Sequence, residues 1–403
     1  MMSINTGTRW GTVVSVYLGG VLAASGLGQV AAVLPLMQNG LGVSLAAMGW
    51  AVSVITVTSA VAGVAGGVWV QRLGARRALL AGLATMAVAA AGGALTDHYG
   101  TLLATRVVAG VGYLLVVVSG PALLVRHTHE RNRTTALAVW STFVPIGIAL
   151  SSFVGGLIGP GIGWPAWFLV CAAATAAVAV LVAVAVPAGA RQTAETGTTE
   201  KATPGRWLTR PVLLALGFCA VSSISVALSV LLPAFLIEQR ELPLWTAGTI
   251  NAVVSLVSVP GSLLAGWLLR RGVGYAWLAL GSVVLPAAAL FAFSSASWPV
   301  NAVAAGVMSL VNGVLIAGVF AVVPVLAGDG RRMDLVNGLI TQFGSIGALL
   351  GPPVLTRTAS WGWEIVPLVV AVIVLPGGAL VWAAVRRPRR PRPAPAPALA
   401  EER

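Results

Sequence analysis

Charged residues are scarce in this sequence. Lysine, arginine, aspartate and glutamate make up 9% of the 403 residues, whereas soluble domains carry roughly 25%. Hydrophobic residues reach 58%, and the mean hydropathy is +0.93. A soluble protein of this composition, such as an alanine-rich helical one, would lack the polar side chains that cover a surface in water. The composition therefore indicates an integral membrane protein, whose lipid-facing surface needs no charge.

Cysteine and histidine are also rare. The two cysteines, Cys171 and Cys219, fall inside apolar runs, and the three histidines lie near the ends of such runs or between them. Because there is no disulfide framework or metal-ligand spacing, we expect inert packing cysteines, no metal and no cofactor. The stretch GGVWVQRLG lacks the Gly-Lys-Ser/Thr ending of a phosphate loop, and no hydrolase constellation occurs. These absences argue against an enzyme.

Apolar runs longer than twenty residues dominate what remains. A barrel strand would alternate apolar and polar residues over about ten positions, and only a helix satisfies every backbone group within one such run. The sequence thus predicts an all-α integral membrane fold of twelve transmembrane helices. The predicted spans are 11–37, 47–70, 77–95, 101–125, 134–158, 165–187, 211–238, 245–269, 275–295, 299–327, 334–356 and 364–386.

The basic residues predict the orientation in the membrane. With the N-terminus inside, almost all of the 24 lysines and arginines fall in cytoplasmic segments, and Arg106, Arg240 and Arg357 are the exceptions. This bias places both termini in the cytoplasm. The net charge of +13 is then a topology signal, and nucleic-acid binding is disfavoured because no exposed basic domain exists.

The chain divides into two halves of six spans. We expect an N-terminal half over residues 1–186, a cytoplasmic linker over 187–210, a C-terminal half over 211–386 and a disordered basic, proline-rich tail over 387–403. Two stretches of the first half recur about two hundred residues later. FVPIGIALSSFVGG is echoed by FGSIGALLGPPV, and GVWVQRLGARR is echoed by GWLLRRGVG. Such repeats indicate a duplicated six-helix unit.

A cluster of arginines between the second and third spans gives the most specific signal. The chain resembles the major facilitator superfamily, whose signature in this loop is close to G-x-x-x-D-R-x-G-x-R-R. Gln71 stands where that family has Asp. The matching residues are Gly67, Arg72, Gly74, Arg76 and Arg77.

Two further motifs of that family are matched less completely. Arg106, Gly110 and Gly112 fit R-x-x-x-G-x-G in the fourth span. Gly147, Gly155 and Gly156 fit the frame of G-x-x-x-G-P-x-x-G-G, a fifth-span motif associated with exporters, but Ser151 and Ser152 replace its Gly-Pro centre. The resemblance implies a secondary transporter that works by alternating access.

The arginine cluster has two interpretations. Basic residues at a tight bend keep that bend in the cytoplasm, which accounts for the cluster by topology alone. Alternatively, Arg72 or Arg76 latches the cytoplasmic side by pairing with acidic groups or with helix C-terminal carbonyls. Glu130 is the nearest acidic candidate, and Asp334 could cap the eleventh span in place of the missing motif Asp.

Polar residues inside spans are the candidate substrate-binding or coupling residues. Arg106 is the one clear ionisable case, and it shares a helical face with Gly110 and Tyr113. We expect this face to line a central cavity; the alternative is an arginine that snorkels to the headgroups. The other candidates, each of which could simply bond to a neighbouring helix, are Gln29, Asn251, Asn312 and Gln342.

No Asp or Glu lies deep in a predicted span. Asp97 and Glu238, at span ends, are the candidates for proton coupling. We expect a monomeric, multi-pass transporter of the cytoplasmic membrane that exports an amphipathic small molecule in exchange for protons. The alternative is an importer or exchanger of a small organic anion with Arg106 as its counter-ion. A receptor or scaffold without transport is disfavoured because nothing beyond the helical core could signal.

Overall fold

The computed structural model describes residues 8–187, 208–327 and 330–386, and within them all regular structure is helical. We call residues 8–187 the first half and residues 208–386 the second half. The greater part of the predicted linker and the whole predicted tail lie outside the described residues, so the division into domains stays a prediction.

Short breaks interrupt the first half at defined positions. Gly42 takes a left-handed φ of 64° and ends one helix, and Ser44 caps the next by accepting a hydrogen bond of 3.3 Å from the amide of Ala47. Gly74 bends the chain at φ 83°. The elements are α1 (Trp10–Gly28), η1 (Ala31–Val33), α2 (Leu34–Leu41), α3 (Leu45–Ser53), η2 (Val54–Thr56), α4 (Val57–Leu73), α5 (Ala75–Ala94), α6 (Tyr99–His127), α7 (Glu130–Trp140) and α8 (Phe143–Ala185).

The second half has longer uninterrupted helices. Its elements are α9 (Thr209–Arg240), α10 (Leu244–Arg270), α11 (Tyr275–Ala279), α12 (Gly281–Ala292), α13 (Trp298–Ala327), α14 (Gly330–Ala359), η4 (Trp363–Ile365) and α15 (Val366–Val385).

The twelve predicted spans have counterparts in these elements. Ten helices of the described chain are long and apolar enough to cross a membrane, and Gly281–Ala292 is a shorter apolar helix. One of the ten, α8, has 43 residues and turns at Gly163, whose φ of 78° and ψ of 163° are not helical, so it supplies two spans. The predicted all-α membrane fold is confirmed, but four spans predicted as continuous are interrupted. The span 11–37 is broken after Gly28, 47–70 by η2, 134–158 between α7 and α8, and 275–295 between α11 and α12.

The outward faces of the helices are apolar. Val88, Val184, Leu263 and Leu368 are each more than 60% exposed. Exposed apolar side chains in this number would be unfavourable in water, and they suit contact with lipid chains.

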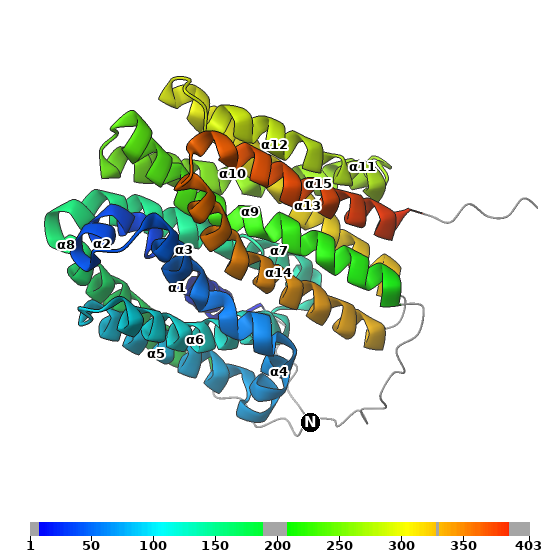
Figure 1. Ribbon diagram of the computed structural model, residues 1–403. Helices are drawn as coiled ribbons and strands as arrows, with labels where there is room; N and C mark the ends of the chain where they lie inside the picture. Colours follow the sequence, from blue (N-terminus) through cyan, green and yellow to red (C-terminus); the bar gives the residue numbers. More distant parts are fainter. Residues whose placement is uncertain (1–7, 188–207, 328–329, 387–403) are drawn as a thin grey trace, which may run out of the picture.

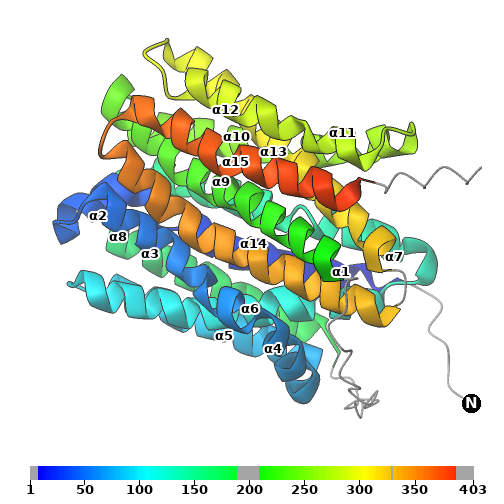
Figure 2. The ribbon, with the colours of Figure 1, turned by 45° about the vertical axis from the view of Figure 1, so that its right-hand side comes forward.

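Both halves run between the same two ends of an elongated bundle (Figures 1 and 2). The start of α1, the end of α8, the start of α9 and the end of α15 meet at one end, which we call the terminal end. The turn between α4 and α5, with its arginines, also lies there. We call the other end the opposite end.

The halves share one hydrophobic core and keep two separate ones. The shared core lies toward the opposite end and joins Met48 and Phe168 of the first half to Phe235 and Trp363 of the second. Toward the terminal end, one core is built from first-half residues and another from second-half residues. The shared hydrophobic core thus joins the halves toward the opposite end, whereas the two cores toward the terminal end are each built within one half.

Candidate functional site

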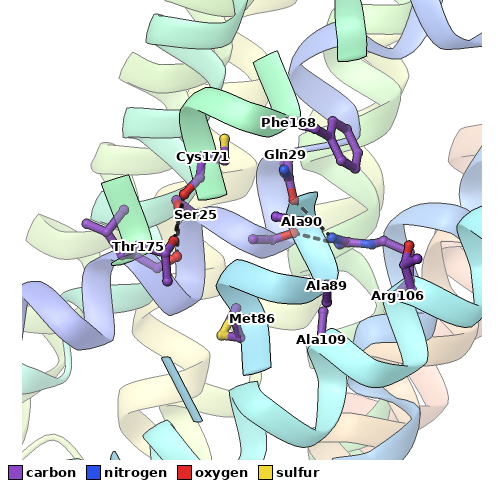
Figure 3. Close-up of a pocket in the computed structure, with 13 residues that line it drawn as sticks. Ser25, Gln29, Met86, Ala89, Ala90, Arg106, Ala109, Phe168, Cys171 and Thr175 are labelled. Atoms are coloured by element: carbon purple, nitrogen blue, oxygen red, sulfur yellow. Dashed lines mark hydrogen bonds between the residues drawn. The ribbon is translucent and has the colours of Figure 1, made fainter. Parts of the chain in front are cut away.

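Arg106 lies inside the first half, where it is 2% exposed. Its Nε donates to the carbonyl of Ala51 at 3.0 Å, its Nη1 to Oε1 of Gln29 at 3.2 Å, and its Nη2 to the carbonyl of Gly26. That last distance is 2.6 Å. Figure 3 shows the guanidinium reaching from α6 toward the amide of Gln29, the residue directly after α1. A buried guanidinium held by three acceptors is not snorkelling toward headgroups, so the geometry opposes that alternative.

The acceptors of Arg106 come from two interrupted helices. The helix α1 ends at Gly28 and α3 ends at Ser53, and each is followed by a short 3-10 turn. Carbonyls in the last turn of a helix have no partner within that helix. Gly26 and Ala51 lie in those last turns, so one guanidinium satisfies a carbonyl at each break. Because the guanidinium carries five N–H donors and no acceptor, it suits this role.

Trp167 strengthens the same junction from the second part of α8. Its indole Nε1 donates at 3.0 Å to the main-chain carbonyl of Gln29. The side chain and the backbone of Gln29 are thus held by two different helices, α6 and α8, which fixes the direction of its amide.

A small cavity of about 20 Å³ lies beside Arg106. It is enclosed by helices of the first half, and none of its lining residues is acidic. Since a site for one water needs about 10–15 Å³, this cavity has room for a single small particle. The lining residues are Leu22, Ser25, Gly26, Gln29, Met86, Ala89, Ala90, Thr105, Arg106, Ala109, Phe168, Cys171 and Thr175.

The other predicted polar residues lie away from this cavity, at helix contacts. Asn312 on α13 donates to the carbonyl of Val221 on α9 at 3.2 Å. Gln342 on α14 donates to the carbonyl of Ala60 on α4 at 3.1 Å, which joins the two halves. Tyr113 is partly buried against the first-half core. Their proposed roles in substrate binding therefore stay predictions.

Asn251 joins the halves nearer the opposite end. Its Nδ2 donates to Oγ of Ser152 on α8 at 2.8 Å and to the carbonyl of Ser229 on α9 at 3.3 Å. Gly156 and Gly248 let α8 and α10 approach closely at the same place. Ser152, a departure from the exporter motif, is thus part of the contact between halves.

The proton-coupling candidates are exposed near the opposite end. Asp97 lies between α5 and α6, and Glu238 lies in the last turn of α9. Neither lines the cavity beside Arg106. Their role also stays a prediction.

The arginine cluster makes contacts within the first half. Arg76 donates from Nε to the carbonyl of Val186 and from Nη2 to that of Ala183, both at 2.7 Å, at the end of α8. These are helix C-terminal carbonyls, as the latch hypothesis allows, but they do not bridge the halves. Arg72 and Arg77 are exposed.

The remaining gate residues are only partly described. Gly67 lies within α4, and Gly74 forms the bend after it. The side chains of Gln71, Glu130 and Asp334 lie outside what the structure describes. The latch therefore stays a prediction.

Sequence reasoning did not assign a role to Cys171, which lines the cavity with Gln29 and Arg106. It was expected to be inert packing. The sequence does not indicate that Cys171 and Gln29 meet, because the two residues are far apart in the chain. Their contact depends on the turn of α8 at Gly163, which brings the second part of α8 back to α1.

Comparisons with known proteins all point to one family. A family model described as Major Facilitator Superfamily matches residues 16–352. The methylenomycin A resistance protein of Streptomyces coelicolor is 28% identical over 251 residues, 59% of this chain and 48% of its own length. The tetracenomycin C resistance and export protein of Streptomyces glaucescens is 29% identical over 164 residues, 41% of this chain and 30% of its own. The chain thus spans less than half the length of these curated relatives.

A solved structure shares the fold along nearly the whole chain. It is the crystal structure of a bacterial homologue of the human lysosomal transporter Spinster in an inward-facing, unoccupied conformation. The TM-score is 0.77 at 16% identity, and the match covers 95% of this chain and 98% of that one.

Proposed function

Because this chain belongs to the major facilitator superfamily, we propose that it is a secondary transporter that exports an amphipathic small molecule by alternating access, driven by the proton gradient. The packing of the two halves carries this proposal. One shared core at the opposite end and separate cores at the terminal end allow the halves to rock about their contact.

The relatives support export rather than import. Two of them bear names that describe resistance to, or export of, an antibiotic. The exporter-type frame of Gly147, Gly155 and Gly156 in α8 is consistent with this direction. Gly147 packs against α1 and Gly156 against α10, whereas Gly155 lies against Ala32 and Trp167.

The terminal end faces the cytoplasm in this proposal. It bears the arginines of the α4–α5 turn, and basic residues favour the cytoplasmic side. Labelling of a Thr198→Cys variant by an impermeant maleimide added outside intact cells should fail. Ready labelling would reverse the orientation and, with it, the direction of export.

Proton coupling needs a group that titrates in both access states. With the opposite end outside, Asp97 and Glu238 would exchange protons with the external medium. They are the candidates because the spans of the described chain hold no deeper carboxylate.

Exchange of a small organic anion is the second candidate. The missing carboxylate partner of Arg106 favours it, since an organic anion could act as counter-ion. The cavity beside Arg106 opposes it, because about 20 Å³ is too small for any organic anion.

Purified protein in liposomes separates these candidates. Ethidium should accumulate in vesicles with an acidic lumen, through the protein molecules inserted with their terminal end outward, and collapse of the pH gradient should abolish it. Empty liposomes are the control. Acetate or lactate exchange that does not depend on the pH gradient, without ethidium transport, would instead support the second candidate.

A further inference from the structure

Arg106 is a buried cation that has no anionic partner among the residues the structure describes. Its acceptors are two main-chain carbonyls and one amide, all neutral. Within the described first half the one acidic side chain whose position is described, Asp97, is exposed and does not line the cavity. A buried charge is strongly disfavoured unless an opposite charge compensates it. The two broken helices account for the hydrogen bonds of Arg106 but leave its charge unbalanced.

Gln29 gives a second, independent sign that something is bound here. Its side chain is 3% exposed, and its Nε2 has no hydrogen-bond partner within residues 8–187, 208–327 and 330–386. The amide is held in this direction because Arg106 occupies its Oε1. A buried donor without an acceptor is rare in folded proteins. Two of the five N–H groups of Arg106 are likewise left over after its three hydrogen bonds.

The cavity fits one small ligand of negative charge. Its volume of about 20 Å³ exceeds what a single water needs, about 10–15 Å³, and excludes larger molecules. Much of its wall is apolar, with Met86 and Phe168 facing it, which suits a polarisable and weakly hydrated ion.

We propose that this cavity binds a chloride-sized inorganic anion, held by Nε2 of Gln29 and the guanidinium of Arg106. The anion neutralises Arg106 and, because the cavity wall is built from α1, α5, α6 and α8, ties together four helices of the first half. A water molecule could accept the same hydrogen bonds but would leave the charge uncompensated. The proposal does not depend on the substrate or on the direction of transport.

Thermal unfolding of the purified full chain tests the site. Tryptophan fluorescence would be followed in sodium gluconate, chloride or bromide at constant ionic strength. Chloride and bromide should raise Tm in a saturable way, by about 2 °C at tenfold excess over Kd and about 3 °C at hundredfold excess, whereas gluconate is too large to enter. Equal Tm values in all three salts would overturn the proposal and leave water as the occupant.

Two variants link the effect to this cavity. Gln29→Glu supplies an internal counter-charge, so Tm should lose its chloride dependence. Gln342→Glu makes the same chemical change outside the cavity and should keep it. If Gln29→Glu does not fold, Ala90→Val narrows the cavity without altering charge and should also remove the chloride effect. Chloride dependence that persists in Ala90→Val would place the anion elsewhere and contradict the proposal, as would the absence of a bromide anomalous peak beside Gln29.

Discussion

The two halves pack their helices in the same way but differ in the chemistry at the contact. In the first half, Gly147 of α8 lies against the carbonyl of Val21 on α1. In the second half, Gly347 of α14 lies against the carbonyl of Cys219 on α9. Both glycines belong to the echoed stretches of the sequence, so the repeat corresponds to a shared packing device in which a missing Cβ lets two helices touch.

The difference lies in α6 and α13, which precede α8 and α14 in their halves. In the first half, α6 reaches α1 through the charged side chain of Arg106. In the second half, α13 reaches α9 through the neutral side chain of Asn312. The corresponding helices α6 and α13 thus contact α1 and α9 through a charged side chain in one half and a neutral one in the other, at different positions of the repeat.

The largest expected effect breaks this asymmetry at Arg106. Arg106→Gln removes the charge and leaves carbonyls of Gly26 and Ala51 without donors, at about 1–3 kcal/mol for each unsatisfied group. Ethidium transport should fall below a tenth of wild type. Asn312→Ala, a change in the corresponding helix of the second half, removes one neutral hydrogen bond worth about 1 kcal/mol and should retain most activity. Equal losses in the two variants would show that the halves do not differ in this way.

The next largest effect tests whether the glycine contacts of the two halves are equivalent. Gly147→Ala and Gly347→Ala should each destabilise the protein by about 1–3 kcal/mol, because a methyl group would press on a main-chain carbonyl. Gly306→Ala is the control: a Cβ there meets nothing within 4 Å, so alanine should be neutral or stabilising by about 0.5–1 kcal/mol. Thermal unfolding in detergent measures all three. If alanine is tolerated at only one of Gly147 and Gly347, the two halves do not share this way of packing their helices.

A smaller effect concerns the contact between halves. Asn251→Ala removes the hydrogen bond to Ser152, worth about 0.5–1.5 kcal/mol, and should shift the population toward opening of the opposite end by about two- to tenfold. Labelling of a buried Thr356→Cys, in a background without Cys171 and Cys219, should then become faster. Thr249→Ala should leave labelling unchanged because that hydroxyl bonds within its own helix. Equal labelling rates in the Asn251→Ala and Thr249→Ala variants would mean that Asn251 does not help to keep the opposite end closed.

The smallest effect tests the latch. Replacing both Arg72 and Arg76 by alanine should raise labelling of Thr341→Cys at the terminal end by at most about fivefold, since exposed pairs are worth about 0–1 kcal/mol. The observed partners of Arg76 lie in its own half, which is why little is expected. Arg77→Ala is the control from the same cluster. If Arg77→Ala has the same effect as the double variant, the arginines set topology only.

Much of the fold could be predicted from local composition. Long apolar runs fix the spans because a membrane leaves helices as the way to satisfy the backbone. Arg106 could be singled out because a charge inside a span is costly. Its partners could not, since the break after Gly28 and the donated bond to Ala51 depend on tertiary contacts that no local pattern encodes. The contact of Asn251 with Ser152 links residues 99 positions apart and was equally out of reach.

Alternating access is tested most directly by distances measured across the bundle at its two ends. Spin labels would be placed in a background without native cysteines, as a terminal-end pair at Leu73 and Arg271 and as an opposite-end pair at Leu95 and Ser297. Double electron–electron resonance in liposomes would measure the distance within each pair, with and without ethidium, at two pH values. The account predicts that, between these conditions, the terminal-end distance shortens while the opposite-end distance lengthens. Distances that stay fixed at both ends, or change in the same sense, would contradict rocking of the two halves.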